Sequence, residues 1–125
     1  MKKLFTNICI ASDHAGYELK EKIKDYLINK SISVIDLGPF TDNSVDYPDY
    51  AKKVAKRLTL RKSDAGILVC GSGTGMAITA NKFKGIRAAQ CYSKHNTILS
   101  REHNNSNVIC LGSRMLKYKD AFKYV

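Results

Sequence analysis

The chain has 125 residues, of which 44% are apolar and 26% are charged, a composition typical of one globular domain and not of a disordered chain. No apolar run reaches the roughly 20 residues needed to cross a bilayer, and the N-terminal segment has no signal-peptide cleavage site, so we expect a cytoplasmic protein that does not insert into membranes. The formal net charge of +10 comes mostly from lysines spread over predicted helix surfaces, which predicts no nucleic-acid binding because no stripe of basic and aromatic residues is present.

Five short apolar runs, rich in β-branched residues and bounded by Gly, Asp, Ser or Asn, predict strands buried on both faces. These are residues 7–11, 33–37, 66–70, 86–90 and 107–111.

Helical patterns alternate with these runs. Leu19, Ile23 and Leu27 recur at helical spacing and predict one apolar stripe. A second stripe begins at Tyr47, with Pro48 placed in a first helical turn. Further helices are predicted after Gly73, over residues 97–102 and over residues 115–125. Strand and helix alternate five times, which predicts a single doubly wound (Rossmann-like) α/β domain over residues 1–125, a five-stranded parallel sheet with helices on both faces.

Ligands of such sheets bind beyond the carboxyl ends of the strands. The segments that follow strands in this chain carry reactive and anion-binding side chains, and we expect them, together with His103, to share one edge of the sheet. They are residues 12–16, 46–48, 70–75 and 112–114.

The segment Gly71, Ser72, Gly73, Thr74 and Gly75 follows a strand and opens a helix. Without Cβ atoms its backbone can curl so that several N–H groups point at one bound oxygen or phosphate, helped by the positive end of the helix. The spacing is neither that of a P-loop nor that of a dinucleotide fingerprint. A purely structural alternative is a tight turn that needs glycine for steric reasons.

Cys70 ends the third predicted strand beside this loop, where a helix N-terminus favours the thiolate, so it is a candidate nucleophile or general base. The alternative is a structural, buried cysteine. Cys9 and Cys110 lie inside apolar runs and are predicted to be buried, and the wide spacing of the four cysteines predicts neither a disulfide framework nor a metal site.

His14 and His103 are candidate proton carriers, and Arg114 suits a phosphate because its guanidinium can bind two oxygens at once. Taken singly, each could be a hydrogen-bonded loop histidine or a surface ion pair. The segment around Ser72 is not G-x-S-x-G, so no serine-hydrolase elbow is evident. A thiol, two histidines, a loop of N–H donors and an arginine together predict proton abstraction beside a carbonyl group of a phosphorylated substrate.

The chain resembles the sugar-phosphate isomerase family that contains ribose-5-phosphate isomerase type B and the galactose-6-phosphate isomerase subunits. The matching motifs run in order over nearly the whole chain, at residues 12–16, 46–48, 70–75, 80–82, 85–88 and 101–107. The cysteine at position 70 favours the ribose-5-phosphate branch.

This resemblance implies interconversion of ribose 5-phosphate and ribulose 5-phosphate, a step of the non-oxidative pentose phosphate pathway, without metal or cofactor. It implies that His103 helps to open the sugar ring. Cys70 then moves a proton from carbon 2 to carbon 1 through an enediolate, and the N–H groups of residues 71–75 hold the developing oxyanion. Ser72 supplies a hydroxyl group at the same site.

The resemblance also assigns the substrate-binding residues. Asp13, His14, Tyr47 and Asn104 are expected to contact sugar or phosphate, and Arg114 the phosphate. A homodimer is implied, with a dimer of dimers as the larger alternative, and its active sites lie at the subunit interface. His103 and Arg114 are therefore candidates for serving the neighbouring subunit's site.

Family members usually continue into a C-terminal tail whose arginines grip the partner's substrate, whereas this sequence stops at Val125. We therefore expect the domain to lack that tail. This leaves open a non-catalytic or impaired sugar-phosphate-binding subunit, and the family leaves open an isomerase of a six-carbon sugar 6-phosphate such as allose or galactose 6-phosphate.

Overall fold

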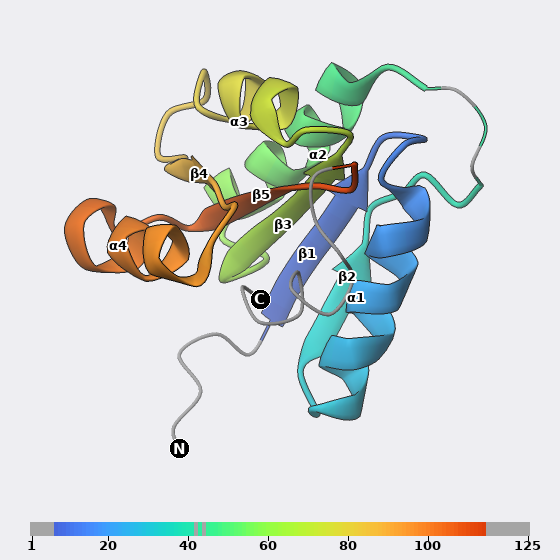
Figure 1. Cartoon of the computed structure of the whole chain (residues 1–125), viewed down its shortest axis with the longest axis horizontal. Coiled ribbons are helices and arrows are strands. Elements are labelled where there is room, and N and C mark those ends of the chain that lie inside the picture. The colour runs from blue at the N-terminus through green and yellow to red at the C-terminus, as the bar shows by residue number, and fades with distance from the viewer. Residues whose placement is uncertain (1–6, 42, 44, 115–125) are drawn as a thin grey trace.

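The computed structural model describes residues 7–41, 43 and 45–114, and the helix expected over 115–125 lies outside this part of the chain. Its five strands form one parallel sheet in the order β2-β1-β3-β5-β4 (Figure 1). The strands are β1 (Asn7–Ser12), β2 (Ser33–Asp36), β3 (Ala65–Cys70), β4 (Ala88–Gln90) and β5 (Val108–Gly112). All five predicted strands are confirmed.

β4 is shorter than the predicted run of residues 86–90. The N–H of Ile86 closes a turn on the carbonyl of Phe83, and the N–H of Arg87 is bonded by the side chain of Asn107. The pairing of β4 with β5 begins at Ala88, which lies opposite Val108.

Four helices are described: α1 (Tyr17–Asn29), α2 (Tyr47–Thr59), α3 (Thr74–Ala80) and α4 (Lys94–Asn104). α1 buries the predicted stripe of Leu19, Ile23 and Leu27 against one face of the sheet. α2 and α3 cover the opposite face, where Val54 and Met76 are fully buried. The predicted arrangement of helices on both faces is thereby confirmed, and α4 lies beside the edge strand β4 (Figure 1).

α4 is longer than the predicted 97–102 because both of its ends are capped. The hydroxyl of Ser93 accepts a hydrogen bond from the N–H of Asn96, and the chain leaves the helix through a left-handed residue, Asn105, at φ 46°. None of the described helices is long and apolar enough to cross a bilayer.

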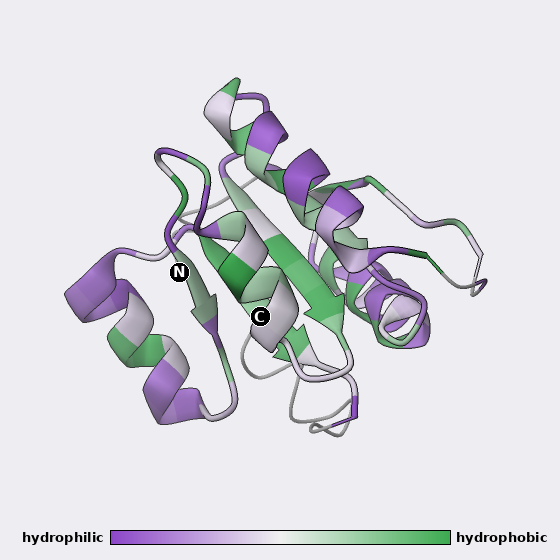
Figure 2. Ribbon diagram, turned by 90° about the horizontal axis from the view of Figure 1, so that it is seen from above, coloured by the Kyte–Doolittle hydropathy of each residue, from purple (hydrophilic) through white to green (hydrophobic). Residues whose placement is uncertain are grey.

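Successive side chains along a strand point to opposite faces of the sheet, so neighbouring residues at the ends of β1 and β3 belong to different cores. Ile10 and Val69 belong to the core under α1, whereas Ala11 and Cys70 belong to the core under α2 and α3. Figure 2 shows hydrophobic residues in the central strands and hydrophilic ones along the outer helices. The thiol of Cys70 therefore lies at the end of the central strand β3, on the side of α2 and α3.

Candidate active site

A pocket of about 320 Å³ opens at the carboxyl ends of the strands. It is lined by Asp13, Tyr47, Cys70, Gly71, Ser72, Gly75 and Arg114, each of which the sequence predicts as a site residue. These residues come from the ends of β1, β3 and β5 and from the start of α2. The strand ends meet there because the strands are parallel, as the fold class predicts.

Cys70 is only 6% exposed and nevertheless lines this pocket. Its sulfur accepts a hydrogen bond of 3.0 Å from the N–H of Gly73, so the loop curls over the strand end and orients the thiol. Gly73 has φ 87°, a left-handed conformation that favours glycine. The turn therefore needs glycine at position 73 for steric reasons. This does not exclude the second role of the loop, which is to supply N–H donors.

Side chains also approach the loop closely on either side, at positions where a Cβ atom would displace them. A Cβ atom at Gly75 would lie 2.8 Å from the ring of Tyr47, and one at Gly71 would lie 2.9 Å from Nη1 of Arg114. Tyr47, 40% exposed as the first residue of α2, and Arg114 thus flank the loop directly. A cationic guanidinium beside a loop of N–H groups suits an anionic ligand.

Backbone hydrogen bonds hold the end of β5 beside the loop. The carbonyl of Cys70 accepts from the N–H of Ser113 at 2.7 Å, and the carbonyl of Gly71 accepts from the N–H of Arg114 at 2.9 Å. These bonds fix Arg114 at the pocket of its own chain.

Gln90, at the end of β4, is a positioning residue that sequence reasoning missed. Its amide nitrogen donates to the carbonyl of Ser72 at 3.0 Å and to the hydroxyl of Thr74 at 2.9 Å. Within the loop, the N–H of Thr74 donates to the hydroxyl of Ser72. The sequence contained one indication of this role: Gln90 is a polar residue at the end of a predicted strand.

Asp13 is buried, and its carboxylate accepts a hydrogen bond of 2.9 Å from the N–H of Gly16. The N–H of Asp13 donates to the carbonyl of Val69, one residue before Cys70. His14 is exposed and does not line the pocket; its Nδ1 accepts from the N–H of Val45, in the segment that leads to Tyr47. The structure thus links His14 to the start of α2.

His103 and Asn104 do not lie with Cys70. They are the last two residues of α4, which returns from the carboxyl end of β4 to the amino end of β5. The carbonyl of Asn104 accepts from the side chain of Arg87, just before β4 begins. The prediction that His103 shares an edge with Cys70 is wrong within one chain, because α4 runs antiparallel to the strands and ends at the opposite edge of the sheet.

The other three cysteines lie in the protein interior. Burial raises the pKa of Cys9 and Cys91, and it raises the pKa of Cys110 well above the ordinary value, with the neighbouring thiols of Cys70 and Cys91 adding to this shift. The predicted burial of Cys9 and Cys110 is confirmed. Cys70 alone among the four contributes to the pocket wall.

Comparisons with known proteins agree with this architecture. The model of the Ribose/Galactose Isomerase family matches residues 8–125. Ribose-5-phosphate isomerase B of Escherichia coli (strain K12) is 43% identical over 109 residues, which cover 87% of this chain and 73% of that protein.

Two solved structures are similarly close. The ribose 5-phosphate isomerase of Thermotoga maritima superimposes with a TM-score of 0.94 at 50% identity, covering 95% of this chain and 82% of the other. Ribose-5-phosphate isomerase B of Mycoplasma genitalium with bound ribulose-5-phosphate gives a TM-score of 0.88 at 45% identity, covering 94% and 79%.

Proposed function

This chain belongs to the ribose/galactose isomerase family, and we propose from this premise and from the pocket around Cys70 that it interconverts ribose 5-phosphate and ribulose 5-phosphate. It is an isomerase, and the reaction is a step of the non-oxidative pentose phosphate pathway in the cytoplasm. The observation that carries the proposal is the sulfur of Cys70, which lies at a pocket that also contains Arg114 and the glycine loop.

The chemistry is a proton transfer between neighbouring carbons. In the open-chain aldose, the sulfur of Cys70 takes the proton from carbon 2. The electrons of that C–H bond form the double bond between carbons 1 and 2, and the former carbonyl oxygen at carbon 1 takes up the negative charge. The hydroxyl proton on the oxygen at carbon 2 then passes to the negatively charged oxygen at carbon 1. As carbon 2 becomes the new carbonyl, the electrons of the double bond take the proton back from Cys70 at carbon 1.

The loop of residues 71–75 stabilises the negative charge on oxygen in this intermediate. One well-placed N–H donor contributes about 3 kcal/mol to such a transition state. Gln90 and the backbone bonds of Ser113 and Arg114 fix the loop beforehand, so little reorganisation accompanies the reaction. The hydroxyl of Ser72 belongs to the same loop and assists in holding the substrate.

Charge orients the substrate in the pocket. Arg114 attracts the phosphate, whereas the carboxylate of Asp13 repels it and suits the sugar hydroxyls as a hydrogen-bond acceptor. Tyr47 forms the wall on the side of α2, and Ser72 and Gly75 form it on the side of the loop. This places the sugar between Asp13 and Cys70. His14, which bonds Val45 just outside the pocket, and Thr74 of the loop are the further residues we assign to substrate binding.

The family resemblance assigns ring opening to His103, which lies at the opposite edge of the sheet from Cys70 of the same chain. We infer that a second copy of the chain supplies His103, with Asn104 beside it, in a homodimer or a dimer of dimers with sites at the interface. Arg114, in contrast, acts in the pocket of its own chain.

The first experiment measures formation of ribulose 5-phosphate by the purified protein and by Cys70→Ala. We expect the rate of the variant to fall by about a thousand-fold or more, because the base is lost. Cys91→Ala is the matched control: it removes a buried thiol outside the pocket, so its rate is expected to stay near that of the wild type. Equal rates for Cys70→Ala and the wild type would exclude Cys70 as the base.

Substrate choice is tested with the same preparation. Faster turnover of allose or galactose 6-phosphate would reassign the chain to a six-carbon branch. Tight binding of ribose 5-phosphate without turnover would identify a non-catalytic binding subunit.

The second experiment mixes Cys70→Ala and His103→Ala chains, each inactive by itself. If His103 acts across the interface, half of the dimers formed by random exchange are mixed and each contains one intact site, so about a quarter of the wild-type rate returns. No recovery after confirmed exchange would contradict the shared site.

A further inference from the structure

The side chain of Lys20 is 0% exposed, and its ammonium lies beside the turn that follows β2. It donates to both carboxylate oxygens of Asp36, at 2.9 and 2.8 Å, and to Glu21 at 3.0 Å. It also donates to the backbone carbonyl of Pro39 at 2.8 Å. A buried charge is tolerated only when it is fully paired, so these contacts hold α1, the end of β2 and the following turn at one point.

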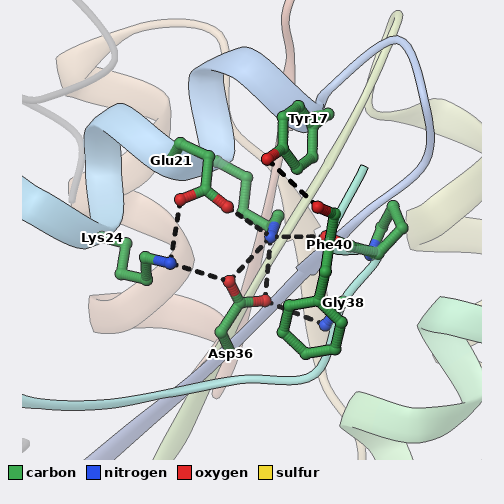
Figure 3. Close-up of polar contacts among 8 residues, drawn as sticks. Tyr17, Glu21, Lys24, Asp36, Gly38 and Phe40 are labelled. Carbon is green, nitrogen blue, oxygen red and sulfur yellow. Dashed lines mark hydrogen bonds and ion pairs between the residues drawn. The ribbon is translucent and has the colours of Figure 1, made fainter. Parts of the chain in front are cut away.

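Further contacts hold the same turn against α1. The N–H of Gly38 donates to Asp36 at 2.9 Å, and the hydroxyl of Tyr17 donates to the carbonyl of Phe40 at 3.3 Å (Figure 3). The ammonium of Lys20 lies 5.1 Å from the centroid of the Tyr17 ring and 5.7 Å from that of Phe40. We refer to Tyr17, Lys20, Glu21, Lys24, Asp36, Gly38, Pro39 and Phe40 as the Lys20 cluster.

The Lys20 cluster is joined to Asp13 along two short routes. The carbonyl of Gly38 accepts from the N–H of Ser12, the residue directly before Asp13, at 3.1 Å. The N–H of Lys20 itself donates to the carbonyl of Gly16 at 2.9 Å, and the N–H of Gly16 donates to the carboxylate of Asp13. Both routes end at a carboxylate that lines the pocket.

A third link starts at Asp13 itself. The next residue, His14, accepts a hydrogen bond from the N–H of Val45, and α2 begins two residues later at Tyr47. The other half of the pocket is held by the bonds of Ser113 to Cys70 and of Arg114 to Gly71. The Lys20 cluster is therefore joined most directly to the substrate-contacting half of the pocket, and only more remotely to the base, through the bond of Asp13 to Val69.

We propose that Lys20 is a positioning residue for substrate binding: by holding the turn at residues 38–40 against α1, it places Asp13, His14 and Tyr47 opposite Cys70. This inference rests on the proposed function for the identity of the substrate. Lys20 does not itself line the pocket and acts entirely through these neighbours.

The test compares Lys20→Met with Lys24→Met, each assayed well below its own unfolding temperature. Lys24 contacts the same two carboxylates, Asp36 at 3.1 Å and Glu21 at 2.8 Å, but these contacts do not include the carbonyl of Pro39. For Lys20→Met we expect KM for ribose 5-phosphate to rise about ten-fold, the effect of one charge-assisted hydrogen bond, with kcat within about two-fold. Lys24→Met is expected to keep both values.

A readout independent of activity is hydrogen exchange of single backbone amides. In Lys20→Met the amides of Ser12 and Gly38 should exchange about ten-fold faster than in Lys24→Met. The amide of Ser113, which bonds Cys70, serves as the internal control and should keep its rate. A purely stabilising role would lower the unfolding temperature without altering KM or this contrast among amides.

A folded Lys20→Met with wild-type KM and unchanged exchange at Ser12 overturns the proposal. If Lys20→Met does not fold, Asp36→Asn takes its place with Glu21→Gln as control, and an unchanged KM and unchanged exchange in Asp36→Asn overturn it equally. A wild-type chain that does not isomerise ribose 5-phosphate refutes the proposed function instead. In that case, faster exchange of the Ser12 and Gly38 amides in Lys20→Met, with the Ser113 amide unchanged, would still show that Lys20 holds the segment next to Asp13 in place.

Discussion

The N–H of Gly73 donates a hydrogen bond of 3.0 Å to the sulfur of Cys70, so a left-handed glycine orients a buried thiol, three residues before it, that lines the pocket. The sulfur is shielded from bulk water by the same loop that offers N–H groups to a substrate oxygen. The base and the oxyanion donors consequently share one short segment, and whatever holds that segment affects both.

Gln90 provides the first prediction. Gln90→Leu removes both bonds to the loop, at Ser72 and Thr74, and we expect kcat to fall about ten-fold because the N–H donors are no longer fixed. Gln90→Glu should be more damaging, since a carboxylate faces the carbonyl of Ser72 and opposes negative charge on the substrate. Steady-state kinetics on both variants checks this, and a fully active Gln90→Glu would contradict the assigned role.

Thiol reactivity provides the second prediction. In the folded protein, iodoacetamide should modify Cys70 first, and ribose 5-phosphate should slow that reaction. Cys9, Cys91 and Cys110 should react only after unfolding, because burial shields them and raises their pKa values. Mass spectrometry of the labelled peptides provides the readout. Equal labelling of Cys91 and Cys70 in the native state would contradict the expected order.

The packing of Tyr47 on Gly75 provides the third prediction. In Gly75→Ala the new Cβ meets the ring of Tyr47, so the ring must move. We therefore expect KM for ribose 5-phosphate to rise about five-fold. In a Tyr47→Ala background the same glycine change should have little further effect, because the atoms it collides with are gone. Four KM values, one for each corner of this cycle, give the coupling, and strictly additive effects would count against the contact.

Acid stability provides the fourth prediction. Burial by itself would raise the pKa of Asp36, but hydrogen bonds from Lys20, from the N–H of Gly38 and from Lys24 outweigh it and hold the pKa below its ordinary value. The contribution of Asp36 to the free energy of unfolding is therefore complete above the pKa that its carboxyl has in the unfolded chain, about 4. It is lost as the pH falls through the lower pKa of the folded state.

Chemical denaturation between about pH 6 and pH 2 measures this fourth effect. The wild type should lose more unfolding free energy than Asp36→Asn over the acid part of that range, because the variant has no carboxylate to protonate. Parallel curves for the two proteins would show that Asp36 does not contribute.

The elements of the fold and most of the pocket could be predicted from local sequence. Apolar runs and helical stripes such as that of Leu19, Ile23 and Leu27 depend on spacing along the chain, which the residues themselves specify. Cys70, Asp13 and Arg114 could be foreseen as neighbours because each follows a strand of a parallel sheet. The length of α4 was underestimated because its N-cap, Ser93, lies four residues before the predicted start at Thr97.

Tertiary structure alone decided the contacts between segments distant in the chain. The strand order brings the end of β4 beside the loop after β3, which lets Gln90 reach Ser72, and the direction of α4 sends His103 to the opposite edge. Lys20 had the appearance of one more surface lysine, yet its burial depends on where Asp36 and Pro39 lie in space. Local periodicity determines which face of an element is apolar, but the partner of a polar side chain depends on strand order and chain direction, which no short stretch of sequence contains.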